Sequence, residues 1–437
     1  MRNVLARSIV KSSILTLTLT LAACGGGASS LLDFSGKEAP LSGDREAVLP
    51  DAGGDNIGAA TEPLVLPQAF ANTSWSQPGG NAAHSLQHLA FGPGTDELFS
   101  VSAGEGSNKY GRLTAPPIID GGRAFILDSE ANVQAIDAAT GKRLWDVSLV
   151  PKNEDPEGGY GGGLASDGVK LYAVTAFGEA IAISMVDGKI LWRERVDAAV
   201  RTAPTVADGR LIFVAVNNDI TALSTVDGMR LWTYQGTGEQ AAALSSSSPA
   251  IAGDIVIAPT TAGDLVAVSA SSGMMLWQQS LTALDTSTGL ANLNDISARP
   301  VISGDKVFAI SHTGRFAAFN LNTGERMWEL NISGTEAPWI AGDALFLISE
   351  NNLAAHSTRS GGNYWQAKLP KGKWIGPVLA GGRLLALSDE GNMASFDPQT
   401  GKLLATRDLG GSYYIAPVIA SGTAYLLNDD ADLTALR

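Results

Sequence analysis

Cysteine and histidine, which often act as nucleophiles, general bases and zinc ligands, are scarce in this chain. It has 437 residues, one cysteine (Cys24) and four histidines (His84, His88, His312 and His356). His84 and His88 are four residues apart, but no His-Glu-x-x-His pattern and no helical period accompany them. The sequence also lacks a haem-binding Cys-x-x-Cys-His. We therefore predict no catalytic residue, no metal site and no cofactor.

The single cysteine follows a segment with the features of an export signal. Basic residues at positions 2, 7 and 11 precede a short apolar stretch over 12–23, which is too short to span a bilayer core of about 30 Å. The stretch ends in Leu21-Ala22-Ala23-Cys24, which resembles the lipobox of bacterial lipoproteins. The resemblance implies cleavage before Cys24 and its acylation, with palmitate among the chains. Residues 1–23 are then a signal peptide.

Residues 24–70 are expected to be a lipidated cysteine and a flexible tether. They are rich in Gly, Ser, Ala, Pro and acidic residues and show no sustained period. Gly25 follows the cysteine, where an Asp retains enteric lipoproteins at the inner membrane, so the implied location is the outer membrane, lipid-anchored and facing the periplasm. The alternative is a plain secretory signal with an incidental cysteine. A formal net charge of −14 argues against nucleic acid as a partner.

The rest of the chain repeats a phrase that positions an aromatic residue. In its first full form it runs from Ala135 to Trp145, with Gly141 four residues before the Trp, and one copy ends on Ala405 instead. Steps of 37 to 51 residues between copies indicate a solenoid or a propeller. We interpret the tryptophans as anchors that pack one unit against the next, not as a ligand cage; they are Trp145, Trp192, Trp232, Trp277, Trp328 and Trp365.

A second phrase predicts the strands of each unit. It occurs eight times, first at residues 115–127, and places a short apolar strand, a glycine-containing turn such as Asp208-Gly209, and another apolar strand. The anchor phrase supplies two further strands, and no segment shows a helical period over ten residues. Four antiparallel strands per unit predict an all-β fold, an eight-bladed β-propeller over residues 71–437.

The eighth unit lacks its fourth strand, because the chain ends at residue 437 just after the third. Two N-terminal segments could supply it, residues 74–76 and 97–102. Phe99 lies 46 residues before Trp145, within the range of the repeat, so we predict that residues 97–102 close the ring with Phe99 as the anchor. Closure removes an open sheet edge. Trp75 is then expected in an extension packed on the ring.

The phrase Ala-x-[Asp/Asn/Ser]-x-x-[Thr/Asp]-Gly-x-x-x-Trp resembles the pyrroloquinoline-quinone (PQQ)-type propeller repeat, over about residues 72–437. Two classes share this repeat: the quinoprotein dehydrogenases, and non-enzymatic propellers, chiefly the BamB family of outer-membrane lipoproteins. The first class implies a calcium-bound quinone, an Asp base and, in many members, a pair of cysteines, whereas this chain has one cysteine. The lipobox, the tether, the lone propeller and the length match the second class.

Likeness to the BamB family implies a non-enzymatic scaffold of the outer-membrane β-barrel assembly machinery. Such a scaffold docks on the barrel-forming subunit and aids insertion of outer-membrane proteins, with unfolded clients as further partners. A quinoprotein-like or other small-molecule-binding propeller, and a polysaccharide-associated one, remain as alternatives. Residues 290–300 look like the family's Leu-Ser-Asp-Val-Asp loop, with Ser297 in place of the second Asp. The segment 242–245 matches a Leu- and Arg-bearing stretch, although its Arg is missing.

The lengths of the connections between blades indicate the same two segments. The connections at residues 146–163, 233–247 and 278–298 are longer than the others, and extra length on one face of a repeat protein usually marks its binding face. Neutral drift in surface loops is the alternative. The candidate partner-binding residues are Ala243, Leu244, Leu293, Asn294, Asp295, Ile296 and Arg299.

Overall fold

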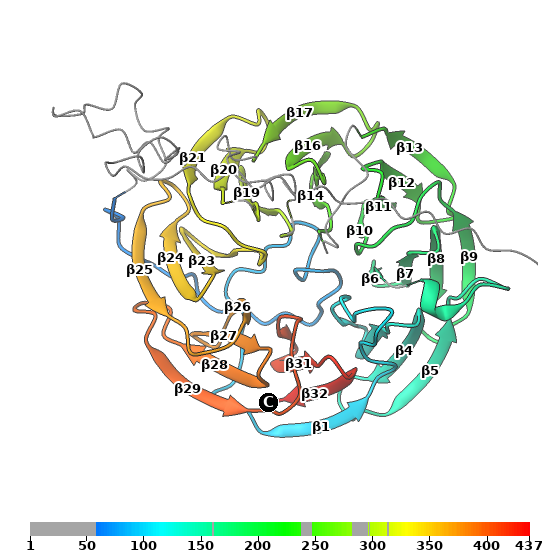
Figure 1. The fold of residues 1–437 in the computed structure, drawn as a ribbon, viewed down its shortest axis with the longest axis horizontal. Coiled ribbons are helices and arrows are strands. Elements are labelled where there is room, and N and C mark those ends of the chain that lie inside the picture. Colours follow the sequence, from blue (N-terminus) through cyan, green and yellow to red (C-terminus); the bar gives the residue numbers. More distant parts are fainter. Residues whose placement is uncertain (1–57, 160, 237–246, 282–295, 297, 313) are drawn as a thin grey trace, which may run out of the picture. The chain divides into compact units, whose positions relative to one another are not determined.

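The computed structural model describes residues 58–437 except 160, 237–246, 282–295, 297 and 313. Within these residues the chain forms 32 strands, which pair into eight four-stranded antiparallel sheets. The sheets stand as blades around a common axis (Figure 1). The predicted fold class, an all-β propeller of eight blades, is confirmed. In the described part of the chain, no helix has the length and apolar character needed to cross a membrane.

The blades are numbered I to VIII along the chain, with their strands given from the axis outwards. Blade I contains β2 (Ile118–Asp120), β3 (Arg123–Leu127), β4 (Asn132–Asp137) and β5 (Arg143–Ser148); blade II contains β6 (Gly162–Ser166), β7 (Lys170–Thr175), β8 (Glu179–Ser184) and β9 (Ile190–Arg195). Blade III contains β10 (Thr205–Ala207), β11 (Arg210–Val214), β12 (Ile220–Ser224) and β13 (Arg230–Tyr234); blade IV contains β14 (Ala250–Ala252), β15 (Ile255–Pro259), β16 (Asp264–Ser269) and β17 (Met275–Ser280). Blade V contains β18 (Val301–Ser303), β19 (Lys306–Ile310), β20 (Phe316–Asn320) and β21 (Arg326–Leu330); blade VI contains β22 (Trp339–Ala341), β23 (Ala344–Ser349), β24 (Asn352–Ser357) and β25 (Asn363–Lys368). Blade VII contains β26 (Trp374–Ala380), β27 (Arg383–Ser388), β28 (Asn392–Phe396) and β29 (Leu403–Asp408); blade VIII contains β30 (Val418–Ala420), β31 (Thr423–Leu427), β32 (Asp432–Leu436) and β1 (Glu97–Ser102). One short 3-10 helix, η1 (Pro156–Gly158), lies between blades I and II.

The first strand and the last strand of the chain meet in blade VIII. β1 pairs antiparallel with β32, with Phe99 opposite Ala435 and Val101 opposite Leu433. The predicted closure of the ring by residues 97–102 is therefore confirmed. Because β1 covers the outer edge of β32, blade VIII is completed like the other seven.

The repeated phrase forms the turn between the third and fourth strands of a blade. In blade I the Asp137 carboxylate accepts hydrogen bonds from the backbone N–H groups of Ala139 (3.1 Å) and Thr140 (2.9 Å). Gly141 follows with a φ of +75°, a conformation that side chains disfavour. Asn320 makes the same pair of contacts in blade V. A short polar side chain followed by glycine thus specifies this turn.

The tryptophan anchors join successive blades from I to VII by a hydrogen bond. Each of six indole N–H groups donates to a backbone carbonyl that lies three residues before the phrase glycine of the following blade. The distances run from 2.9 to 3.3 Å, and the pairs are Trp145 with Met185, Trp192 with Thr225, Trp232 with Ala270, Trp277 with Leu321, Trp328 with Thr358, and Trp365 with Pro398.

The phrase glycine also leaves room for the tryptophan of the preceding blade. A Cβ built on Gly273 would lie 2.7 Å from the Trp232 ring, and one on Gly324 would lie 2.6 Å from the Trp277 ring. The glycine therefore has two purposes, the left-handed turn within its own blade and the close approach of its neighbour. The turn can be predicted from the sequence of a single repeat, whereas the close approach of the tryptophan depends on the preceding blade.

The junction between blades VIII and I makes the same contacts with different residues. Phe99 lies over Gly141, where a built Cβ would come within 2.7 Å of the phenyl ring. A phenyl ring cannot donate a hydrogen bond, so the carbonyl of Ala138 accepts one from the Tyr425 hydroxyl instead, at 2.9 Å. Burial raises the pKa of Tyr425, which keeps the hydroxyl protonated as a donor.

The hydrophobic core is divided into wedges between adjacent blades. Buried side chains of blades I and II form one cluster, those of II and III another, and the series continues to blades V and VI. The largest cluster joins blades VI, VII, VIII and I to the N-terminal segment. Each blade therefore depends on both neighbours to bury its faces.

The antiparallel order gives the ring two different faces. The connections between blades, and the turns between second and third strands, lie on one face, which we call the connector face. The remaining turns, between first and second and between third and fourth strands, lie on the opposite face, which we call the turn face.

An N-terminal segment, residues 72–89, lies inside the ring near the turn face, and we call it the plug (Figure 1, blue). It winds once around the axis and hydrogen-bonds, at 2.6 to 3.1 Å, to the innermost strand or the following turn of all eight blades. From blade VIII and then I to VII, the pairs are Asn72–Ile419, Trp75–Ile119, Ser76–Ser166, Gln77–Val206, Ala82–Ile251, Ala83–Ile302, Gln87–Gly342 and Leu89–Leu379. The plug thus satisfies backbone groups at the inner edges of the blades.

The plug places Trp75 inside the ring. This residue, expected in an extension on the ring, is 4% exposed and stacks on Trp339 with 6.2 Å between ring centroids. The residues before the plug contact the propeller as well, since Ala59 pairs with Asn363 in β25 and Phe70 pairs with Leu89. Contacts of the propeller therefore begin before residue 71, within the segment that the sequence assigned to the tether.

Candidate functional site

The two connections that the sequence predicts to bind a partner share a base on the connector face. Ser247, just before blade IV, donates a hydrogen bond from its hydroxyl to the carbonyl of Ala298, just before blade V, at 3.1 Å. Leu281, at the start of the second connection, is fully buried. The candidates Ala243 and Leu244, in the first connection, and Leu293 to Asp295, in the second, lie outside the described residues.

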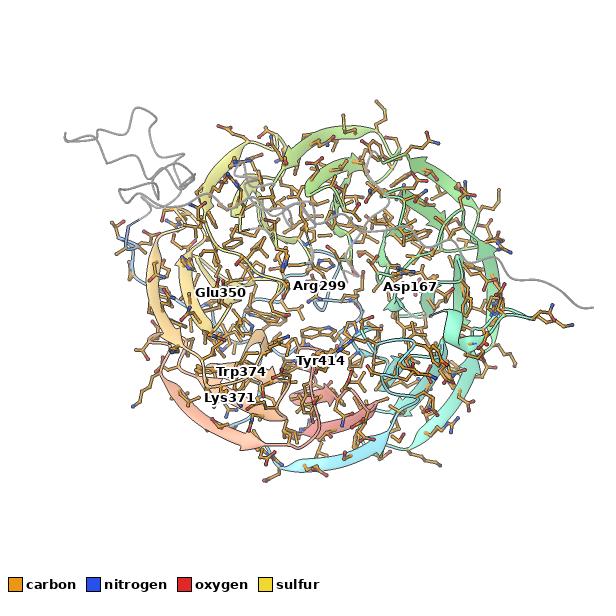
Figure 2. All side chains as sticks on the ribbon, in the orientation of Figure 1. Asp167, Arg299, Glu350, Lys371, Trp374 and Tyr414 are labelled. Carbon is orange, nitrogen blue, oxygen red and sulfur yellow. The ribbon has the colours of Figure 1, made fainter. Side chains whose placement is uncertain are left out.

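The two candidate residues that the structure describes do not lie on the outer surface. Ile296 is fully buried in the wedge between blades IV and V. A side chain packed there cannot also contact a partner, so the structure gives Ile296 a packing role. Arg299 lines the central channel, near the axis of the ring (Figure 2).

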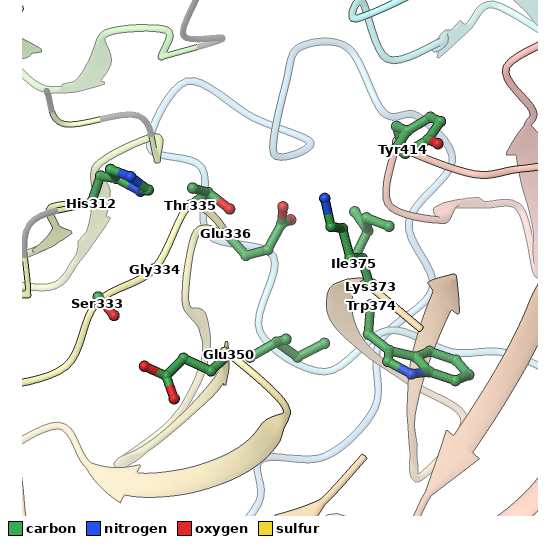
Figure 3. Close-up of a pocket in the computed structure, with 11 residues that line it drawn as sticks. His312, Ser333, Gly334, Thr335, Glu336, Glu350, Lys373, Trp374, Ile375 and Tyr414 are labelled. Carbon is green, nitrogen blue, oxygen red and sulfur yellow. The ribbon is translucent and has the colours of Figure 1, made fainter. Parts of the chain in front are cut away.

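The channel opens at the connector face and ends at the plug. A cavity of about 360 Å³ forms its mouth, with Glu336, Lys373 and Trp374 among the residues that line it (Figure 3). A deeper cavity of about 70 Å³ is lined by Arg299 and, from the plug, by Trp75. Thr335, Glu336, Ile375 and Tyr414 line both cavities. We call the two together the blind pocket, because the plug occupies its far end.

Burial shifts the pKa of three groups around the blind pocket. It raises the pKa of Glu336 to about 7, although the positive charge of Arg299 acts in the opposite direction. It lowers the pKa of Arg299. It also lowers the pKa of His84, in the plug, to about 3, and the nearby Arg299 adds to that effect. His84 is therefore neutral, and its Nδ1–H donates to the carbonyl of Pro300 at 2.8 Å.

Several polar atoms of this region lack hydrogen-bond partners among the described residues. They include Nε1 of Trp75, Nε of Arg299 and Nε2 of His84. No ion pair of the described residues joins Arg299 to Glu336. Buried polar groups are usually paired, and six other buried side-chain atoms of the described residues, among them Nε of Arg123 and Arg210, lack a partner as well. The sequence offered no signal for Glu336 or Lys373, because neither belongs to the repeated phrase.

The described residues do not fit the calcium-bound quinone of the dehydrogenase class. No three His, Cys, Asp or Glu side chains among them are grouped so as to hold a metal ion. The deeper cavity is bounded along the axis by Trp75 and Gly79 of the plug. The histidines His84, His88 and His356 instead use Nδ1 on backbone carbonyls.

Eight interlocked four-stranded blades define the class of the chain, an eight-bladed propeller built from PQQ-type repeats. A family model described as outer membrane protein assembly factor BamB matches residues 129–356 and 349–437. The chain therefore belongs to the BamB family. Outer membrane protein assembly factor BamB of Yersinia pestis is 26% identical over 296 residues, which cover 66% of this chain and 75% of that protein. Its counterpart in Burkholderia pseudomallei is 26% identical over 295 residues, covering 67% and 74%.

Solved structures share the fold across both functional classes. The crystal structure of BamB from Moraxella catarrhalis superposes with a TM-score of 0.66 at 17% identity, covering 78% of this chain and 99% of that one. Quinohemoprotein alcohol dehydrogenase from Comamonas testosteroni superposes with a TM-score of 0.70 at 12% identity, covering 84% and 81%. At these identities the likeness concerns the fold alone, so the function must be argued from family and site.

Proposed function

We propose that the protein is a non-enzymatic scaffold lipoprotein of the machinery that assembles β-barrel proteins in the outer membrane. In this proposal it docks on the barrel-forming subunit through the connections before blades IV and V, and it helps to position unfolded outer-membrane proteins for insertion. The observation that carries the proposal is membership of the BamB family over the greater part of the chain.

The structure supports the choice of docking face in two ways. Ser247 and Ala298, at the C-terminal ends of the two connections, are joined by a hydrogen bond, so these two ends lie side by side. The turn face is the one at which the plug hydrogen-bonds to the turns after β22 and β26. The connector face, in contrast, carries the longer connections, and loops on a rigid scaffold commonly hold binding residues.

We further propose that Cys24 anchors the protein to the outer membrane, with the propeller in the periplasm. Residues 25–57 would then form the tether, which at most about 3.5 Å per residue spans on the order of 110 Å. Such a reach allows the connector face to dock on a partner without a fixed orientation of the ring to the membrane.

Co-purification of the tagged lipoprotein with the barrel-forming subunit, from detergent-solubilised envelopes, tests the docking proposal. The double variant Leu293→Arg with Asp295→Lys should reduce the recovered subunit at least tenfold, because it places two positive charges in the proposed contact. Its melting temperature should stay that of the parent protein. Glu325→Lys, an exposed charge reversal in the third-to-fourth-strand turn of blade V, is the matched control and should co-purify normally. Recovery of the double variant at the parent level would show that the docking surface lies elsewhere.

A further inference from the structure

The blind pocket contains polar groups that docking through the connections does not use. Arg299 and Trp75 both line its deeper cavity, and Trp75 is 4% exposed. Nε of Arg299 and Nε1 of Trp75 have no hydrogen-bond partner among the residues that the structure describes. Unpaired buried N–H groups are costly and uncommon in folded proteins. Arg299 as a whole is partly exposed and lines the cavity, so a ligand there that brings an acceptor can pair with its guanidinium.

The charges around the site favour a carboxylate over a phosphate as the group that brings this acceptor. A guanidinium keeps its positive charge and presents a planar set of donors that matches a carboxylate or a phosphate. A phosphate would bring up to two negative charges beside Glu336, which lines the same cavity, whereas a carboxylate brings one. We propose that the blind end of the channel is a carboxylate-binding site, with the guanidinium of Arg299 as the counter-ion. This inference goes beyond the proposed function, because it concerns the channel and not the connections.

The plug determines how a ligand can reach this site. It occupies the turn-face end of the channel, so entry is from the connector face, and a polypeptide could bring only its end to Arg299. The mouth cavity of about 360 Å³ lies within the size range of small-ligand sites. It would receive the rest of the ligand beside Lys373 and the half-exposed Tyr414. The carboxylate could therefore belong to a small organic acid or to the carboxyl terminus of a polypeptide.

Glu336 makes binding depend on pH. Its side chain and that of Lys373 point toward each other across the mouth (Figure 3). Burial raises the pKa of Glu336 to about 7, so this group can take up a proton when a second carboxylate enters beside it. Binding should then tighten as the pH falls from 8 to 6. The other charged or titratable groups around it are Arg299, Lys373, Glu350, His312 and Tyr414, with His84 behind Arg299.

Calorimetric titration of the mature protein tests the inference with three probes. N-acetyl-Gly-Gly-Phe carries a free carboxylate, its C-terminal amide does not, and N-acetylglycine is a small carboxylate. The free acid should bind at least tenfold more tightly than the amide. Arg299→Gln should weaken the free acid at least tenfold, and Arg299→Lys should weaken it less. If N-acetylglycine competes equally, the source is a small acid, whereas binding of the peptide alone assigns the site to a chain end.

Two further variants complete the test. Lys371→Gln is the matched control, because Lys371 is exposed, pairs with Glu390 at 2.9 Å and lines neither cavity; it should bind as the parent does. Glu336→Gln should bind the free acid at least as tightly at pH 8 and lose the pH dependence, which keeps the test informative if Arg299→Gln does not fold. Equal affinity for acid and amide, or no binding of either acid at millimolar concentration, would overturn the inference. Its failure would leave co-purification with the barrel-forming subunit unaffected, so the two proposals fail separately.

Discussion

Glu336 and His84 should make opposite contributions to the pH dependence of stability. The pKa of Glu336 is about 7 in the folded protein and 4.5 for an ordinary glutamate. The folded state therefore holds a proton that the unfolded state releases, and stability falls as the pH rises from 4.5 to 7. The pKa of His84 is about 3 in the folded protein against 6.5 ordinarily. Here the unfolded state takes up the proton, so stability falls as the pH drops from 6.5 to 3.

The two contributions should nearly cancel between pH 4.5 and 6.5, and removing either one should expose the other. One proton of difference is worth about 1.4 kcal/mol per pH unit. With an unfolding entropy of about 2 cal/mol/K per residue over roughly 380 residues, this is about 2 °C in melting temperature per pH unit. We expect the melting temperature of Glu336→Gln to rise by about that amount per pH unit, relative to the parent, and that of His84→Gln to fall.

Differential scanning fluorimetry of the parent and the variants from pH 4.5 to 6.5 measures these slopes. The readout is the slope and not the absolute melting temperature, so a constant loss of stability in either variant does not interfere. The double variant should run parallel to the parent, and Glu325→Gln, exposed on the turn face, should do the same. Parallel curves for both single variants would refute the assignment of a protonated Glu336 and a neutral His84.

The contacts of the ring allow three further tests by thermal unfolding. Gly273→Ala and Gly122→Ala both introduce a side chain at a φ of +72°, but only the first meets a tryptophan ring, so it should cost about 1–3 kcal/mol more; equal losses would contradict the second purpose of the phrase glycine. Tyr425→Phe should cost about 1–3 kcal/mol, because it leaves a buried carbonyl unpaired. Gln77→Ala should cost about 2 kcal/mol or more and speed amide exchange at Val206, whose N–H and carbonyl both bond to this side chain; unchanged exchange would show that the plug does not protect blade III.

The blades and their closure could be predicted because each rests on a pattern that recurs along the chain. The spacing of the phrase located the outer strands, and the same spacing selected Phe99 over Trp75 for the closing strand. Polar residues before a glycine, such as Asp137, specify a turn by contacts within a few residues. Local and periodic signals of this kind need no knowledge of the neighbouring blade.

The plug and the blind pocket could not be predicted because they arise from contacts without a period. Asn72 and Gln77 bond to backbone atoms 347 and 129 residues away, and nothing in their immediate sequence marks those partners. Tyr425 replaces a missing indole donor, but it comes from a different strand of its blade than the anchor does. Arg299 was placed with the loop beside it, whereas its position next to the first strand of blade V turns it toward the axis.

The path of the plug has a consequence for the order of folding. Its first contact, between Asn72 and Ile419, spans nearly the whole propeller, and β1 must also wait for β32. The N-terminal part of the propeller is thus synthesised first and completed last. Such long-range closure is slow compared with local pairing, so Asn72 and β1 must remain unpaired until blade VIII forms. A chain truncated before blade VIII would lack β32, the partner of β1, and the contact of the plug with Ile419. It could not complete the native ring.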